Sequence, residues 1–416
     1  MNIYMLLIVS FIFLIYVLQS VADILNVRNI SAKIPKEFTG YFNKDSYAKS
    51  QKYLKTKTKF SLLQASFFTV VEIVFIFAGG FNFADLLARS FGFGEIVTGL
   101  IFFGLLFFAL EILKIPFGAY DTFVIEEKFG FNKTKAVTFI ADLIKNWVIS
   151  AVILGAIFIV VLWFFTEFGK FAWIYSFAAV AVIEMFFAFV YPVVIMPLFN
   201  KFTPLKNGKL KTSVEKYAAK ENFKMKGLFT MDNSKRSTKS NAFFTGFGRF
   251  RRIVLFDTLI KKHTVEELTS VLAHEMGHFK LGHIKKDLIY GFISMAFMFF
   301  LLSVFINSPW LFEAFKMQTA SVYAGVVFFG FLYIPISFII GIISSAISRK
   351  HEYEADAYAV KTYKKPKAMI DALKKLSVDN LSNLYPHKFK VFLEYSHPPT
   401  LERIEAIKKI KITEKK

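Results

Sequence analysis

The sequence predicts a predominantly α-helical polytopic membrane protein with seven transmembrane helices, and three observations lead to that fold class. Of the 416 residues, 55% are hydrophobic and 54 are Phe, an apolar excess that few soluble proteins of this length carry. Seven apolar stretches are long enough to cross a bilayer as helices. The loops between these stretches alternate between basic and nearly uncharged, as the loops of a multi-pass protein do.

Each predicted span is an apolar stretch bounded by charged or turn residues. The seven spans cover residues 2–19, 60–80, 96–116, 147–166, 171–196, 288–307 and 321–347. The first lacks a basic leading region and a small-residue cleavage site, so we expect a retained helix and not a signal peptide.

The distribution of charge predicts the orientation of the chain. Three of the loops are poor in basic residues and contain only Arg89, Lys170 and Lys316 as cations, whereas the loops between them and the tail are basic. The positive-inside rule then places the N-terminus outside and the C-terminus in the cytoplasm. The net charge of +21 is explained in the same way, so the bilayer is the predicted partner and no nucleic acid is expected.

Two soluble segments remain outside the spans. We divide the chain into residues 1–196 with helices one to five, a soluble segment 197–287, helices six and seven in 288–347, and a C-terminal segment 348–416. Two crossings return the chain to the side it left, so the two soluble segments can meet in one domain. The chain has no Cys, which restricts any metal site there to His, Asp and Glu ligands.

A metal-binding pattern lies in the first soluble segment, in the sequence His274-Glu275-Met276-Gly277-His278. Thr264 and Glu267 form a predicted capping box that starts the helix. On that helix His274 and His278 are one turn apart on one face, where two imidazoles can share a tetrahedral zinc. Glu275 lies beside the first ligand and can act as a base on metal-activated water.

A second acidic pattern occupies residues 349–356 of the C-terminal segment. Glu352 and Asp356 share one face of a helix, whereas Glu354 points roughly the other way. Glu352 can supply the third zinc ligand, which would leave the fourth position to water. Asp356 can hold a ligand histidine by its other ring nitrogen. A charged surface helix is the alternative interpretation of this pattern by itself.

Together with both metal motifs, four further segments make the chain resemble the type I CAAX prenyl protease family, the membrane-embedded gluzincin zinc metalloproteases of M48 type. These segments are residues 120–133, 197–205, 240–247, and 396–399 with Arg403. The resemblance implies one zinc per chain at His274, His278 and Glu352, with Glu275 as the catalytic base. It also implies that Asn241 binds the substrate backbone and that His397 and Arg403 line the site as further catalytic residues, where either could stabilise the charge that develops on the oxyanion.

The resemblance further implies that the seven helices enclose a hydrated chamber and that a gluzincin-like zinc protease domain carries a small β-hairpin. Residues 241–256 are typical of such a hairpin, because Gly246 and Gly248 lie between two apolar, aromatic-rich arms. An edge strand there could pair with an extended peptide. Without the resemblance, Asn241 is more simply a turn or capping residue.

We therefore expect an integral membrane zinc metalloendopeptidase that acts on a peptide or protein substrate, prenylated if the chain acts as the resemblance implies. One alternative is a membrane-protein quality-control protease without prenyl specificity. A second, from another class, is a transporter or channel, suggested by the intramembrane carboxylates Glu72, Glu111 and Glu184. The expected membrane is the bacterial inner membrane, or the endoplasmic reticulum in a eukaryote. The oligomeric state stays open.

Overall fold

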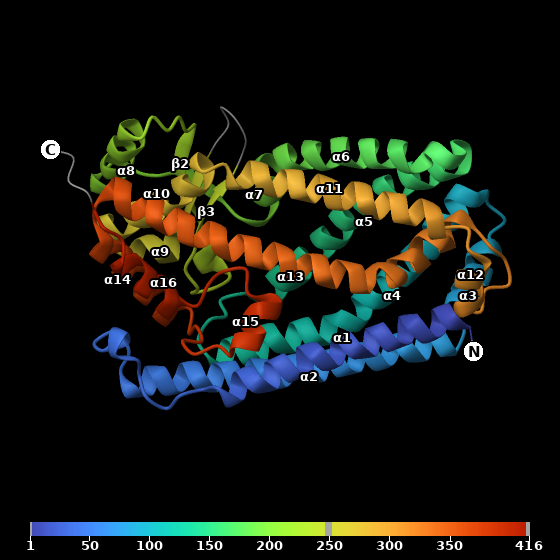
Figure 1. Ribbon diagram of the computed structural model, residues 1–416, viewed down its shortest axis with the longest axis horizontal. Coiled ribbons are helices and arrows are strands. Elements are labelled where there is room, and N and C mark those ends of the chain that lie inside the picture. The colour runs from blue at the N-terminus through green and yellow to red at the C-terminus, as the bar shows by residue number, and fades with distance from the viewer. Residues whose placement is uncertain (1, 246–251, 413–416) are drawn as a thin grey trace.

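Seven long apolar helices form the body of the protein in the computed structural model, which describes residues 2–245 and 252–412 (Figure 1). They are α1 (Ile3–Arg28), α2 (Lys44–Phe77), α4 (Glu95–Tyr120), α5 (Ala136–Glu167), α6 (Ala172–Val190), α11 (His283–Phe305) and α13 (Val322–Tyr363). Two of them continue into π-helical turns, η2 (Asp121–Glu126) after α4 and η4 (Tyr191–Ile195) after α6. Within the described residues seven helices are long and apolar enough to cross a membrane, which is the number predicted.

Much of the apolar surface of these helices is exposed. At most 22% of the most hydrophobic window of each helix is buried inside the protein. Large side chains such as Val70, Val182 and Ile293 are about two-thirds exposed. Contiguous apolar surface on this scale is unfavourable in water and suits contact with lipid.

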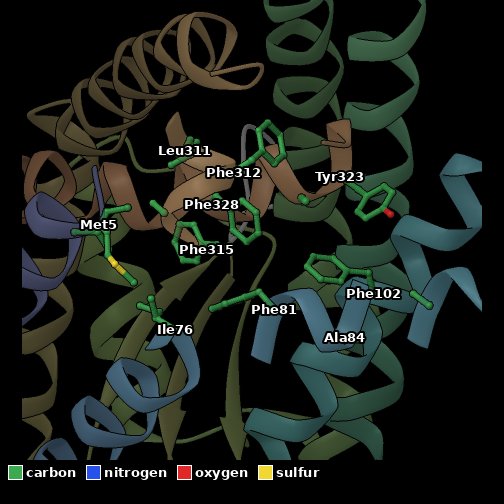
Figure 2. Close-up of a cluster of buried hydrophobic side chains, with 14 of the residues drawn as sticks. Met5, Ile76, Phe81, Ala84, Phe102, Leu311, Phe312, Phe315, Tyr323 and Phe328 are labelled. Carbon is green, nitrogen blue, oxygen red and sulfur yellow. The ribbon is translucent and has the colours of Figure 1, made fainter. Parts of the chain in front are cut away.

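Two short helices that the sequence analysis did not predict lie at the end of the helical body that carries the N-terminus (Figure 1). They are α3 (Gly80–Arg89) and α12 (Pro309–Ala314). Their apolar side chains, including Phe81 and Leu311, pack together with Phe315 and with Phe328 of α13 in a buried cluster (Figure 2). Rings of Phe315 and Phe328 stack with centroids 4.0 Å apart. The loops that contain α3 and α12 are therefore well packed, and they join α1, α4 and α13 at this end.

The soluble elements gather at the opposite end, where the C-terminus lies (Figure 1). The helices there are α7 (Met196–Phe199), α8 (Lys209–Lys220), α9 (Asp257–Lys262), α10 (Val265–Lys280), α14 (Pro366–Asp379), α15 (Lys388–Glu394) and α16 (Thr400–Lys408). The strands are β1 (Phe202–Pro204), β2 (Gly227–Met231), β3 (Ala242–Thr245) and β4 (Arg252–Phe256). Helices from both soluble segments pack on α10, so the two segments do meet.

The strands form one mixed sheet in the order β1-β2-β4-β3, in which β2 and β4 are parallel and the other pairs antiparallel. Strands β3 and β4 are the two arms of the predicted hairpin, with Ala242 opposite Leu255. The predicted turn residues Gly246 and Gly248 lie outside the described residues. Strand β3 is at the edge of the described sheet, where its outer side can accept a further strand.

Candidate metal centre

Helix α10 begins at the predicted capping box, which fixes its direction. The side chain of Thr264 accepts from the backbone N–H of Glu267, and the carboxylate of Glu267 accepts from the N–H of Thr264. Lys375 on α14 donates to the same carboxylate over 2.7 and 2.9 Å. These contacts attach the first turn of α10 to the C-terminal segment, at a point that precedes His274 and His278 in the helix.

The two histidines of α10 converge with a carboxylate of α13. His274 Nε2 lies 3.1 Å from His278 Nε2. Glu352 Oε2 lies 3.4 Å from His274 Nε2, and Glu352 Oε1 lies 3.2 Å from His278 Nε2. Tetrahedral zinc with bonds of about 2.0–2.1 Å separates its ligand atoms by about 3.3–3.4 Å. His274, His278 and Glu352, which we call the metal group, therefore have the spacing and the chemistry of a zinc site. Within the described chain they form the one such group of His and acidic residues.

A buried ion pair supports this group from behind. Asp356 Oδ1 lies 2.9 Å from His274 Nδ1, and Arg403 of α16 donates to both Asp356 oxygens over 2.8 and 2.7 Å. Arg403 Nη1 also lies 3.1 Å from Glu352 Oε2. Burial lowers the pKa of His274, but hydrogen bonds to Asp356 and Glu352 outweigh it and raise this pKa to about 9. The site favours positive charge, as a cation site does.

Glu275 follows the first histidine on α10. Burial raises the pKa of Glu275 above the ordinary value, while His274 and His278 oppose this shift. A bound cation would act in the same direction as the histidines. No hydrogen bond or ion pair engages its carboxylate within the part of the chain that the structure describes. The group is therefore free to take part in proton transfer.

The other residues expected at the site lie at its edge. His397, with a side chain 65% exposed, places Nε2 3.4 Å from Glu352 Oε1 and lies in a turn beside Ser396. Asn241 is exposed and precedes edge strand β3, where its Oδ1 accepts from the N–H of Ala242. The strand itself packs on α10 through the shared core.

Two residues without a role predicted from the sequence support the metal group: His283 contacts His278, and Glu354 contacts His283. His283 Nδ1 lies 3.1 Å from His278 Nδ1, and its Nε2 lies 2.9 Å from Glu354 Oε2. On a continuous helix a residue five positions after His278 would point elsewhere. However, α10 ends at Lys280, and Gly282 adopts a left-handed φ of 71° that redirects the chain. Gly282 is therefore the residue in the sequence that indicates where α10 ends and the chain changes direction.

The fold and the site define a class, namely polytopic membrane proteins with a soluble metallopeptidase centre, and comparison with known proteins identifies the family within it. Residues 23–201 match the family described as CAAX prenyl protease N-terminal, five membrane helices, and residues 204–411 match peptidase family M48. The chain thus belongs to the CAAX prenyl protease 1 family and is an integral, multi-pass M48 zinc metalloprotease. The resemblance, fold class and enzyme class predicted from the sequence are confirmed.

Relatives and a solved structure agree over nearly the whole chain. The chain is 35% identical to a probable CAAX prenyl protease 1 from Schizosaccharomyces pombe, over 90% of this chain and 82% of the relative. It is 33% identical to the CAAX prenyl protease 1 homolog of Arabidopsis thaliana, over 96% of each chain. The crystal structure of S. mikatae Ste24p superposes with a TM-score of 0.92 at 31% identity, covering 97% of this chain and 99% of that one.

Proposed function

We propose that this protein hydrolyses a peptide bond near the prenylated C-terminus of protein substrates, using one zinc ion held by His274, His278 and Glu352. The observation that carries the proposal is the convergence of these three ligand groups at 3.1–3.4 Å from two segments far apart in the chain. The names of the relatives supply the substrate class. Bound zinc would supply Lewis acidity, which polarises a carbonyl group and lowers the pKa of water.

The side chains around the metal group divide the remaining work. Glu275 accepts a proton from the attacking water and donates it to the nitrogen of the leaving amine. His397 donates a hydrogen bond to the oxygen of the scissile carbonyl as negative charge develops there. We assign this role to His397 and not to Arg403, because Arg403 already directs its donors at Asp356 and Glu352. Arg403 instead holds those carboxylates in place.

The substrate backbone lies along the edge of the sheet in this proposal. An extended peptide added beside β3 would pair with main-chain groups of the strand, and Asn241 would bind the peptide at the start of that strand. The soluble segments face the cytoplasm and the N-terminus lies outside, as the charge of the loops predicts. The bacterial inner membrane, or the endoplasmic reticulum membrane in a eukaryote, stays a prediction, as does a hydrated chamber between the helices.

The variant Glu275→Gln tests the mechanism, because glutamine keeps the size of the side chain but accepts no proton. Elemental analysis should find wild-type zinc content, whereas turnover of a farnesylated CAAX peptide should fall at least ~10²-fold. Glu266→Gln on the exposed face of α10 is the matched control and should keep full activity. Undiminished cleavage by zinc-loaded Glu275→Gln would refute the proposed base.

The same assay with an unmodified peptide tests the substrate class. Faster cleavage of the farnesylated peptide is expected from a prenyl-specific enzyme. Equal cleavage of both peptides would instead favour a quality-control protease that accepts membrane proteins generally.

A further inference from the structure

His283 is almost completely buried beside the metal group, although it carries a polar ring. It is the first residue of α11, directly after the left-handed Gly282, and its side chain is 1% exposed. A buried imidazole must find partners for both ring nitrogens or lose their hydration without compensation. His283 finds them in His278 on one side, at 3.1 Å, and in Glu354 on the other, at 2.9 Å.

The ring of His283 is also held in its plane. The ring of His351 stacks on it with centroids 4.0 Å apart and an interplanar angle of 7°. His351 Nδ1 in turn lies 3.4 Å from Asp287 Oδ1. Stacking of this kind allows little rotation about the last torsion of the side chain, so the direction of both nitrogens of His283 is set by packing.

The contacts assign each ring nitrogen of His278 and His283 as either a hydrogen-bond donor or an acceptor. His278 directs Nε2 at Glu352 and His274, so a metal there requires the lone pair on Nε2 and leaves the proton on Nδ1. That Nδ1–H can only donate to His283 if His283 Nδ1 carries a lone pair. The proton of His283 then lies on Nε2 and donates to the Glu354 carboxylate, which is an acceptor when ionised.

We propose that His283 and Glu354 are positioning residues of the metal site, which orient His278 and increase its basicity through the chain Glu354···His283···His278. The proposal rests on the zinc site proposed above. It gives the two ligand histidines equivalent support, because Asp356 contacts the outer nitrogen of His274 directly. Partners of this type fix the tautomer and ring direction of a ligand, and their loss typically weakens metal binding about 10–100-fold.

Zinc affinity of the purified full-length protein, measured by competition with a chelator, tests the proposal without any substrate. His283→Ala should bind zinc about 10–100-fold more weakly than wild type, and Glu354→Ala about tenfold more weakly. The double variant should bind zinc about as weakly as His283→Ala alone, because both changes interrupt the same series of contacts from Glu354 through His283 to His278. Glu266→Ala is the matched control: it removes an exposed carboxylate on α10 that contacts none of these histidines, and it should leave zinc affinity within about twofold of wild type.

Two conservative variants separate orientation of His278 from simple packing. In His283→Asn the side-chain oxygen of the new amide can occupy the place of Nδ1 and accept from His278, whereas the longer amide of His283→Gln reaches the place of Nε2. His283→Asn should therefore recover more zinc affinity than His283→Gln, at similar thermal stability of the zinc-free protein. Equal loss in both variants would show a packing role and overturn the proposal.

The outcomes also separate this proposal from the proposed zinc site. Wild-type affinity in both His283→Ala and Glu354→Ala, with weakened binding in Glu352→Gln, would overturn the role of His283 and leave the metal site standing. Unchanged affinity in Glu352→Gln as well would overturn both. If His283→Ala does not fold, Glu354→Ala decides alone, because its side chain is 37% exposed and lies outside the hydrophobic core.

Discussion

Replacement of Gly277 by Ala should weaken zinc binding, because this position sets how closely α10 approaches α13. A Cβ atom added at Gly277 would lie 3.1 Å from Tyr358 Cδ1, 3.2 Å from the carbonyl oxygen of Ala355 and 3.3 Å from Ala355 Cα. All three atoms belong to α13, and two of them are backbone, which cannot rotate away. Non-bonded carbon atoms prefer about 3.5–4.0 Å. The two helices must therefore separate by up to about half an ångström.

The separation acts directly on the metal group. Glu352 lies on α13 one turn before Ala355, so it retreats with that helix from the histidines of α10. Zinc sites tolerate ligand displacements of about 0.2 Å. We expect zinc affinity to fall on the order of tenfold, which corresponds to about 1.4 kcal/mol. The gain of about 1 kcal/mol from replacing glycine inside a helix is offset by overpacking that costs about 1–3 kcal/mol.

Chelator competition and thermal unfolding of Gly277→Ala measure both effects. Gly341→Ala is the matched control on α13, since nothing lies within 4 Å of the Cβ it would add. That variant should keep wild-type affinity and unfold at the same or a higher temperature. If Gly277→Ala binds zinc as tightly as wild type, the close approach of the helices does not set the geometry of the site.

Three further changes test other parts of the structure. Asn380→Ala should raise KM several-fold with kcat nearly unchanged, because the Asn380 amide bonds both the N–H and the C=O of Ser240, just before the edge strand; a lower kcat at constant KM would contradict this. Glu352→Gln should lower zinc content in elemental analysis, and full occupancy would exclude Glu352 as a ligand. Hydrogen bonding from Lys408 lowers the pKa of Glu37, so this ion pair stabilises the protein above the ordinary pKa of glutamate and is lost as pH falls through the lowered value. Glu37→Gln should therefore unfold at a lower temperature than wild type at pH 7, with the difference shrinking as the pH falls towards and below the ordinary pKa of glutamate; a constant difference would show that the charge of Glu37 is not the cause.

Local features of the chain predicted most of the secondary structure that matters here. Apolar length identified the seven spans, although the helices extend beyond them; α13, for example, continues from its predicted end at residue 347 to Tyr363. That extension follows from the charged sequence after the span, which is helical but too polar to count as membrane. The capping box of Thr264 and Glu267 and the two arms of the hairpin also depend on residues close together in the sequence, so they could be predicted in the same way.

The arrangement around the metal group depended on the tertiary structure. Spacing along one helix brings His274 and His278 together, and this could be derived from the sequence. Three contacts join segments that are distant in the chain: Glu352 meets these histidines, Arg403 pairs with Asp356, and β2 pairs in parallel with β4. They form only when these elements pack against one another, as α13 does on α10, and helical periodicity carries no information about such packing.

His283 marks the boundary between the two kinds of information. A helix that continued unbroken past Lys280 would turn the side chain of His283 away from the site. The left-handed Gly282 ends that periodicity and lets the next helix begin with an imidazole against His278. The amino-acid sequence by itself thus specified the spans, helix α10 and the residue types of the candidate metal site, since these depend on neighbours within one or two turns. Which side chains surround the ligands was decided by how the helices pack, since that depends on the shape of the whole domain.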